Sequence, residues 1–185
     1  MDNKNRILWI TRTAVFIALL IVLQLATAPL GNTIVTGTIV NLILIVSVMT
    51  YGLAPGLTVA AVSPVAAKFL GIGPLWTLIP FIILGNIVLV VIWHFIGNLF
   101  AKERKGAAYV AALVIAAIAK FLTLYIGIVK ISIPVFLNLP EKQAIIISNM
   151  FSVPQLITAF IGGVIAAVIL PTLKKAIGEN PTAKK

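Results

Sequence analysis

Three lysines inside apolar stretches are the residues of this sequence best suited to chemistry. Lys68, Lys120 and Lys130 each lie within or at the edge of such a stretch, and none of these stretches contains Asp or Glu. A charged lysine at the centre of a membrane helix costs about 2.5–3.5 kcal/mol, so it should face an interior, a cavity or the interface. Lys68 and Lys130 can instead extend to lipid headgroups. Lys120 lies deepest, and we expect it to contact an anionic or carbonyl-rich ligand, or helix-end carbonyls left open by a proline.

Other polar side chains lie in the outer halves of the apolar stretches, near loops that we expect to lie outside the cell. We predict a substrate-binding pocket that opens outward, formed by Asn32, Asn41, Lys68, Trp76, Lys120, Tyr125, Lys130, Asn138, Asn149 and Gln155. The loops near Asn32 and Asn138 would close over it. The alternative for each polar residue is a helix-to-helix hydrogen bond, because buried amides find partners in helix bundles.

The chemistry that the sequence lacks narrows its function. His94 is the only histidine and there is no cysteine, so we predict no metal site and no cofactor. No Gly-rich phosphate loop with Lys-Ser/Thr is present, which excludes ATP hydrolysis by this chain. No catalytic constellation or intramembrane carboxylate indicates an enzyme or an ion-coupled carrier. A ligand binder that takes energy from a partner remains, with a structural subunit as the alternative.

Composition places these residues in a membrane. The 185 residues are 61% hydrophobic and 10% charged, whereas soluble domains have about 25% charged residues. Apolar runs of about 20 residues indicate helices, since barrel strands are shorter and alternate apolar with polar residues. We therefore predict an all-α integral membrane protein, a single domain of six transmembrane helices. The net charge of +10 forms no basic stripe with interleaved aromatics, so we expect no nucleic-acid partner.

The six predicted spans are residues 7–28, 36–53, 57–70, 76–100, 107–133 and 144–170. Ala54-Pro55-Gly56 should make the tight turn between the second and third spans, and Pro64 should bend the short third one. In this topology ten basic residues lie on the cytoplasmic side and Lys142 alone lies in an external loop. This asymmetry predicts that both termini are cytoplasmic.

The first span carries Ala14 and Ala18 on one face, because a helix places residues four apart on the same side. Two small residues there let another helix approach closely, so we predict a docking groove for a partner. Similar pairs elsewhere in the chain show that ordinary intramolecular packing is the alternative. A secretory signal peptide is a second alternative, since basic residues and a short apolar core precede Ala26-Thr27-Ala28. It fits less well, because more membrane segments follow.

These features together resemble the S-components of energy-coupling factor (ECF) vitamin transporters. The similarity covers nearly the whole chain, and residues 11–18 (TRTAVFIA) are similar to the family's helix-one pattern, whose alanines are Ala14 and Ala18 here. The resemblance implies a prokaryotic plasma-membrane protein that docks through these alanines on a transmembrane T-component, which works with two cytoplasmic ATPases. It also implies a vitamin held near the outside. S-components share a fold more than a binding motif, so the resemblance assigns no ligand residues.

The substrate follows less directly from the sequence. The chain is similar to S-components annotated for cobalamin or queuosine precursors. A queuosine precursor that bears an amine would meet three lysines and no acidic residue in the spans, which is electrostatically unfavourable for a cation. Cobalamin, with its phosphodiester and amides, is therefore our first expectation, and pantothenate, an anion, is the second. A membrane pore or assembly subunit without a transport substrate is the alternative from another class.

Overall fold

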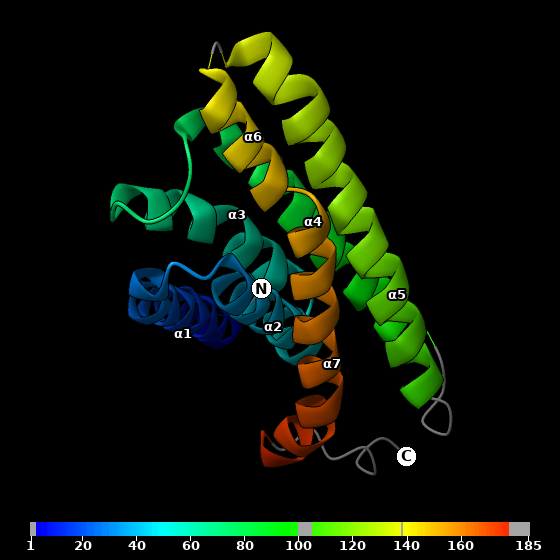
Figure 1. Cartoon of the computed structure of the whole chain (residues 1–185). Coiled ribbons are helices and arrows are strands. Elements are labelled where there is room, and N and C mark those ends of the chain that lie inside the picture. Colours follow the sequence, from blue (N-terminus) through cyan, green and yellow to red (C-terminus); the bar gives the residue numbers. More distant parts are fainter. Residues whose placement is uncertain (1–2, 100–104, 138, 178–185) are drawn as a thin grey trace.

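The computed structural model describes residues 3–99, 105–137 and 139–177, and every regular element within them is helical (Figure 1). The α-helices are α1 (Asn3–Thr27), α2 (Thr33–Tyr51), α3 (Leu53–Phe69), α4 (Ile79–Gly97), α5 (Lys105–Leu124), α6 (Glu141–Met150) and α7 (Val153–Ala176). Two short 3₁₀ helices, η1 (Ala28–Leu30) and η2 (Trp76–Leu78), and a π-helix, η4 (Tyr125–Phe136), complete the set. The all-helical prediction is confirmed for these residues.

Five helical stretches are long and apolar enough to cross a membrane. They are Arg6–Leu30, Thr33–Tyr51, Trp76–Gly97, Gly106–Phe136 and Glu141–Ala176. The third predicted span corresponds to α3, which has 17 residues and is shorter than the others. A crossing by α3, and with it the count of six, stays a prediction.

The turn between α2 and α3 lies earlier than predicted. The chain reverses at Gly52, whose φ of 91° suits glycine, and not at Ala54-Pro55-Gly56. Pro55 instead lies in the first turn of α3, where backbone N–H groups have no acceptor within the helix, so the N–H that proline lacks is not needed. Gly56 lets α3 lie directly on α2, because a Cβ there would lie 2.6 Å from Cβ of Val48. The predicted hairpin therefore exists with shifted boundaries.

The last predicted span is interrupted near its start. α6 ends at Met150 and α7 begins at Val153, because Pro154 in the first turn of α7 lacks an N–H and disfavours helical backbone in the residue before it. A side chain compensates for part of the break, since Gln155 Nε2 donates a 3.0 Å hydrogen bond to the Met150 carbonyl oxygen. The interruption leaves Phe151 buried between the two helices.

Helix α5 continues directly into the π-helix η4, which contains Pro134. The hydrogen bond from Leu137 N to Ser132 O, 3.1 Å long, spans the five residues typical of π geometry. Close packing accompanies the wider turns, because a Cβ at Gly127 would lie 2.6 Å from Cδ1 of Phe81 in α4. This irregular segment directly follows Leu124, the last residue of α5, which lines the cavity described below.

Helix α2 is central in the bundle and packs against α1, α3, α4 and α7. Its side chains Leu44, Ile45 and Val48 are fully or almost fully buried, in one cluster with Leu89 and Trp93 of α4. A polar residue on the inward face of α2 is consequently removed from lipid. Asn41, at 1% exposed, is such a residue.

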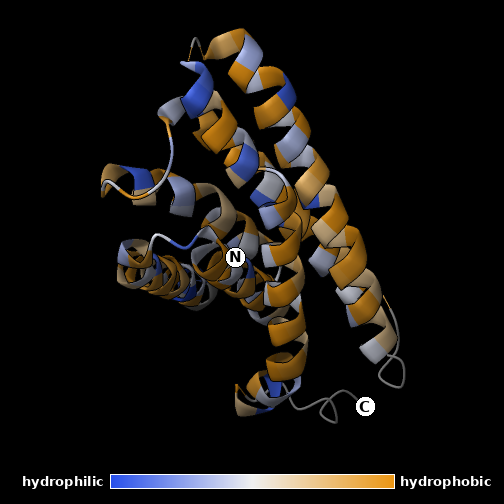
Figure 2. Cartoon of the chain, viewed as in Figure 1, coloured by the Kyte–Doolittle hydropathy of each residue, from blue (hydrophilic) through white to orange (hydrophobic). Residues whose placement is uncertain are grey.

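Helix α1 lies at one side of the bundle and packs against α2 and α3 (Figure 1). It is the least buried of the five long apolar stretches. The outward sides of the long helices α5 and α7 are predominantly hydrophobic (Figure 2). Exposed apolar side chains on the outside, with buried polar side chains such as Asn41 kept inside, are the arrangement expected for a bundle in lipid.

Candidate functional site

The centre of the site is the buried amine of Lys120 on α5. The side chain is 3% exposed, and Nζ donates hydrogen bonds of 2.6 Å to Asn41 Oδ1 and 2.7 Å to Asn86 Oδ1. These two contacts join α5 to α2 and α4. A protonated lysine has three donor hydrogens, so two accepted bonds leave one donor for another group.

The two asparagines are themselves held by neighbouring helices. Asn41 Nδ2 donates to Thr158 Oγ1 of α7 over 3.2 Å, and Asn86 Nδ2 donates to the Ala60 carbonyl oxygen of α3 over 3.4 Å. Because the NH₂ group of each asparagine donates to α7 or α3, its side-chain oxygen is directed toward Lys120. The partners of Lys120 are thus amide side chains, and not the helix-end carbonyls that we offered as one expectation.

A cavity of about 390 Å³ adjoins this polar cluster. It lies where the C-terminal ends of α1 and α3 meet the N-terminal halves of α2, α4 and α7 and the end of α5. The lining residues are Gln24, Ala28, Gly31, Asn32, Thr33, Thr36, Gly37, Val40, Asn41, Ser63, Pro64, Ala67, Ile72, Gly73, Pro74, Ile79, Ile82, Asn86, Lys120, Leu124, Met150, Phe151 and Gln155. This volume is within the range of about 300–1,000 Å³ typical of small-molecule sites.

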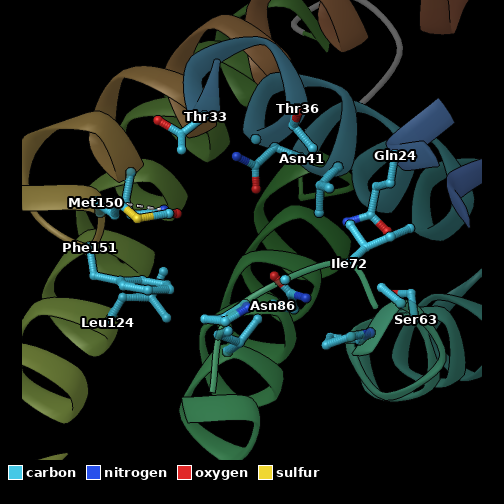
Figure 3. Close-up of a pocket in the computed structure, with 18 of the residues that line it drawn as sticks. Gln24, Thr33, Thr36, Asn41, Ser63, Ile72, Asn86, Leu124, Met150 and Phe151 are labelled. Carbon is cyan, nitrogen blue, oxygen red and sulfur yellow. Dashed lines mark hydrogen bonds between the residues drawn. The ribbon is translucent and has the colours of Figure 1, made fainter. Parts of the chain in front are cut away.

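The cavity has two sides, the first apolar and the second carrying polar side chains beside the apolar Ile72 (Figure 3). Leu124, Met150 and Phe151 lie together on the first, whereas Asn41 and Asn86 lie toward the middle and Gln24 and Ser63 lie opposite. No acidic residue is among those lining it, and the part of the chain that the structure describes holds no cluster of His, Cys, Asp or Glu fit for a metal ion. The site can therefore hold a molecule with an apolar part, a group that accepts a hydrogen bond from Lys120, and groups that accept from or donate to neutral amides.

Four predicted binding residues line the cavity: Asn32, Asn41, Lys120 and Gln155. Asn41 and Lys120 are in its wall as described. Asn32 is exposed and caps α2, because its Oδ1 accepts hydrogen bonds from the backbone N–H of Ile34 at 2.9 Å and of Val35 at 3.4 Å. The structure brings these four together from α2, α5, α7 and the loop before α2.

The other described candidates lie outside the lining, namely Lys68, Trp76, Tyr125, Lys130 and Asn149. Lys130 is exposed and its Nζ lies 5.5 Å from the centre of the Tyr125 ring. Trp76 is half exposed with its ring centre 5.0 Å from that of Phe69, and Asn149 is exposed. Asn138 lies outside the described residues.

Several polar lining residues were absent from the predicted set, namely Gln24, Thr33, Thr36, Ser63 and Asn86. Asn86 lies in the middle of an apolar stretch, which is the same signal that singled out Lys120. Gln24 is likewise an amide inside the first apolar stretch. Ser63 and the threonines give no such signal, because small hydroxyl residues also satisfy themselves on their own helix backbone.

Ala14 and Ala18 are both exposed on α1. Thr11, Val22 and Leu25 share their side of the helix and are also exposed, whereas Thr13 and Leu20 point inward and are buried. The outward strip of Thr11, Ala14, Ala18, Val22 and Leu25 therefore forms a face with a shallow middle that no other described helix covers.

A family model described as "ECF transporter, substrate-specific component" matches residues 9–174. The searches of curated proteins and of solved structures gave no match.

Proposed function

We propose, from the premise that this chain belongs to the family of ECF transporter substrate-specific components, that its cavity binds a small neutral or anionic vitamin for ATP-driven import. Membership makes the chain a substrate-binding membrane subunit and not an enzyme. It also implies a complex with a T-component and ATPases. The substrate, its site and the docking surface are the proposed parts.

The observation that supports the site best is the environment of Lys120. Its Nζ is buried beside the cavity, is held by two neutral amide oxygens, and has no acidic residue among the lining residues to balance a positive charge. A carboxylate or another anionic group of a ligand would supply that balance and would accept the remaining hydrogen. A cationic ligand would find no counter-charge there.

Cavity size bears on the choice of vitamin. About 390 Å³ is near the lower end of the range for drug-sized ligands. Cobalamin, our first expectation, is far larger than such ligands, whereas pantothenate is small and has a carboxylate. We therefore propose a small carboxylate, with pantothenate ahead of cobalamin and of a cationic queuosine precursor.

Charge along the chain supports an outward-facing cavity. Arg6, Arg12, Lys174 and Lys175 lie toward the end of the bundle away from the cavity, where the N-terminal half of α1 and the C-terminal end of α7 are found. By the positive-inside rule that end would be cytoplasmic. The cavity would then take substrate from the outside, and the termini would both lie inside.

The strip around Ala14 and Ala18 is our proposed docking surface for the T-component. Co-expression of this chain with a T-component and two ATPases, followed by purification through a tag on the T-component, tests the assignment. We expect the chain to co-purify and the assembled complex to take up labelled pantothenate in an ATP-dependent manner. A chain that never joins the complex would instead support a membrane pore or assembly subunit.

A further inference from the structure

Gln24 is the one residue of α1, the helix that we propose for docking, whose side-chain amide lies in the cavity wall. Its Oε1 atom is buried and accepts no hydrogen bond. Among the described residues, four other buried polar side-chain atoms share that condition, on Thr38, Trp93, His94 and Ser132, and none of these residues lines the cavity. Gln24 therefore combines an unused acceptor with access to the site.

The other long polar side chains that line the cavity already make hydrogen bonds within the protein. Asn41 Oδ1 and Asn86 Oδ1 each accept a hydrogen bond from Lys120 Nζ, and Gln155 Nε2 donates to the Met150 carbonyl oxygen. Buried polar atoms in native proteins almost always have a partner, because a lost hydrogen bond to water is otherwise not replaced. An acceptor without one, at the edge of a ligand-sized cavity, indicates a partner that arrives with the ligand.

We infer that Gln24 is a substrate-binding residue whose side-chain oxygen accepts a hydrogen bond from an N–H or O–H group of the bound molecule. The inference rests on the proposed function and adds to its substrate class. Lys120 requires an acceptor or an anionic group, and Gln24 requires a donor at another point of the same molecule. A small carboxylate that also has hydroxyl or amide N–H groups meets both requirements.

The place of Gln24 gives this contact a second consequence. α1 packs only along one side, against α2 and α3, and its other side is the strip with Ala14 and Ala18. A molecule bound to both Gln24 and Lys120 would connect α1 to the α2, α4 and α5 cluster through the cavity (Figure 3). Substrate would thereby help to hold the helix that we propose for docking.

The test is Gln24→Met in the full chain, since methionine keeps the length of the side chain and removes the acceptor. Leu23→Met is the matched control, because Leu23 is the adjacent residue on α1, is partly buried, and does not line the cavity. Isothermal titration of the purified proteins with pantothenate, cobalamin and a queuosine precursor measures affinity. Thermal unfolding without any vitamin measures the effect on the fold.

We expect Gln24→Met to weaken the vitamin that the parent binds by about tenfold, with the ligand-free unfolding temperature unchanged or raised. Leu23→Met should bind as the parent does. Parent-like binding by Gln24→Met would overturn the inference and leave the proposed function standing. A lower unfolding temperature of the ligand-free Gln24→Met variant would have the same consequence. A parent chain that binds none of the three molecules would overturn the proposed function and this inference with it.

Discussion

Nζ of Lys120 lies 2.6 Å from Oδ1 of Asn41, a hydrogen bond that joins residues 79 positions apart in the sequence. This contact fixes the amine in the interior of the bundle, where the side chain is buried. Because amide oxygens are neutral, the bond orients the amine without cancelling a positive charge. The predictions below follow from that uncompensated group and from the helices that surround it.

Lys120→Met should lower the affinity for an anionic vitamin by about tenfold to a hundredfold, as expected for a hydrogen bond to a charged group worth about 1.5–3 kcal/mol. Lys68→Met and Lys130→Met are the matched controls, because both lysines lie outside the cavity lining. Titration of the three purified variants with pantothenate makes the comparison. Equal losses in all three would contradict a specific role for Lys120.

The depth of Lys120 could be predicted from its place in an apolar stretch, but its partners could not. Asn86 lies on α4, which packs against α5, whereas Asn41 lies on α2 and is reached by the long lysine side chain across the bundle. Spacing along the chain does not specify such neighbours. The direction in which each side chain points around its helix was the second feature that the sequence could not predict. Leu124 lines the cavity while the adjacent Tyr125 faces elsewhere, and the π-helix that starts there changes the periodicity on which a sequence argument depends.

The ends of the helices were also only partly predictable from the sequence, because they depend on local backbone chemistry. We predicted one continuous span over residues 144–170, and only the structure shows that α7 restarts near Pro154 and that Phe151 turns into the cavity wall. Ala14 and Ala18 could be placed on one face from spacing alone. Which way that face points depends on how α1 packs, and the structure turns it outward.

Ala14→Trp or Ala18→Trp should reduce assembly with the T-component while vitamin binding by the isolated chain persists. A bulky ring would fill the shallow middle of the strip and keep a partner helix at a distance. Val168→Trp is the control, since Val168 is also an exposed apolar residue but lies on α7, away from the strip on α1. Co-purification and titration are the two measurements, and a variant that loses both would indicate a folding defect.

Gly162→Ala should destabilise the bundle by about 1–3 kcal/mol, the usual effect of overpacking. A Cβ there would lie 2.8 Å from the carbonyl oxygen of Thr38, which is backbone of α2 and cannot move without separating α2 from α7. Gly106→Ala provides the comparison, because nothing lies within 4 Å of the added carbon. Thermal unfolding in detergent should show a lower midpoint for the first variant only.

Asn86→Asp separates the charge of Lys120 from its hydrogen bonding. The carboxylate would lie where Asn86 Oδ1 now accepts a 2.7 Å bond from Nζ, so it would give the lysine the acidic partner that the described lining residues lack. The lysine, its position and one accepted hydrogen bond would all be kept. We expect pantothenate affinity to fall by at least about tenfold, because a second negative charge beside Lys120 repels the ligand's carboxylate.

A control for the added charge is Asn98→Asp. Asn98 is exposed at the far end of the same helix, where its Nδ2 donates to the His94 carbonyl oxygen over 2.7 Å. This variant gains the same charge away from the cavity and should bind pantothenate as the parent does. If Asn86→Asp also binds as the parent does while Lys120→Met is weakened, Lys120 acts as a hydrogen-bond donor to a neutral group. The substrate would then be an uncharged, carbonyl-rich molecule and not a carboxylate.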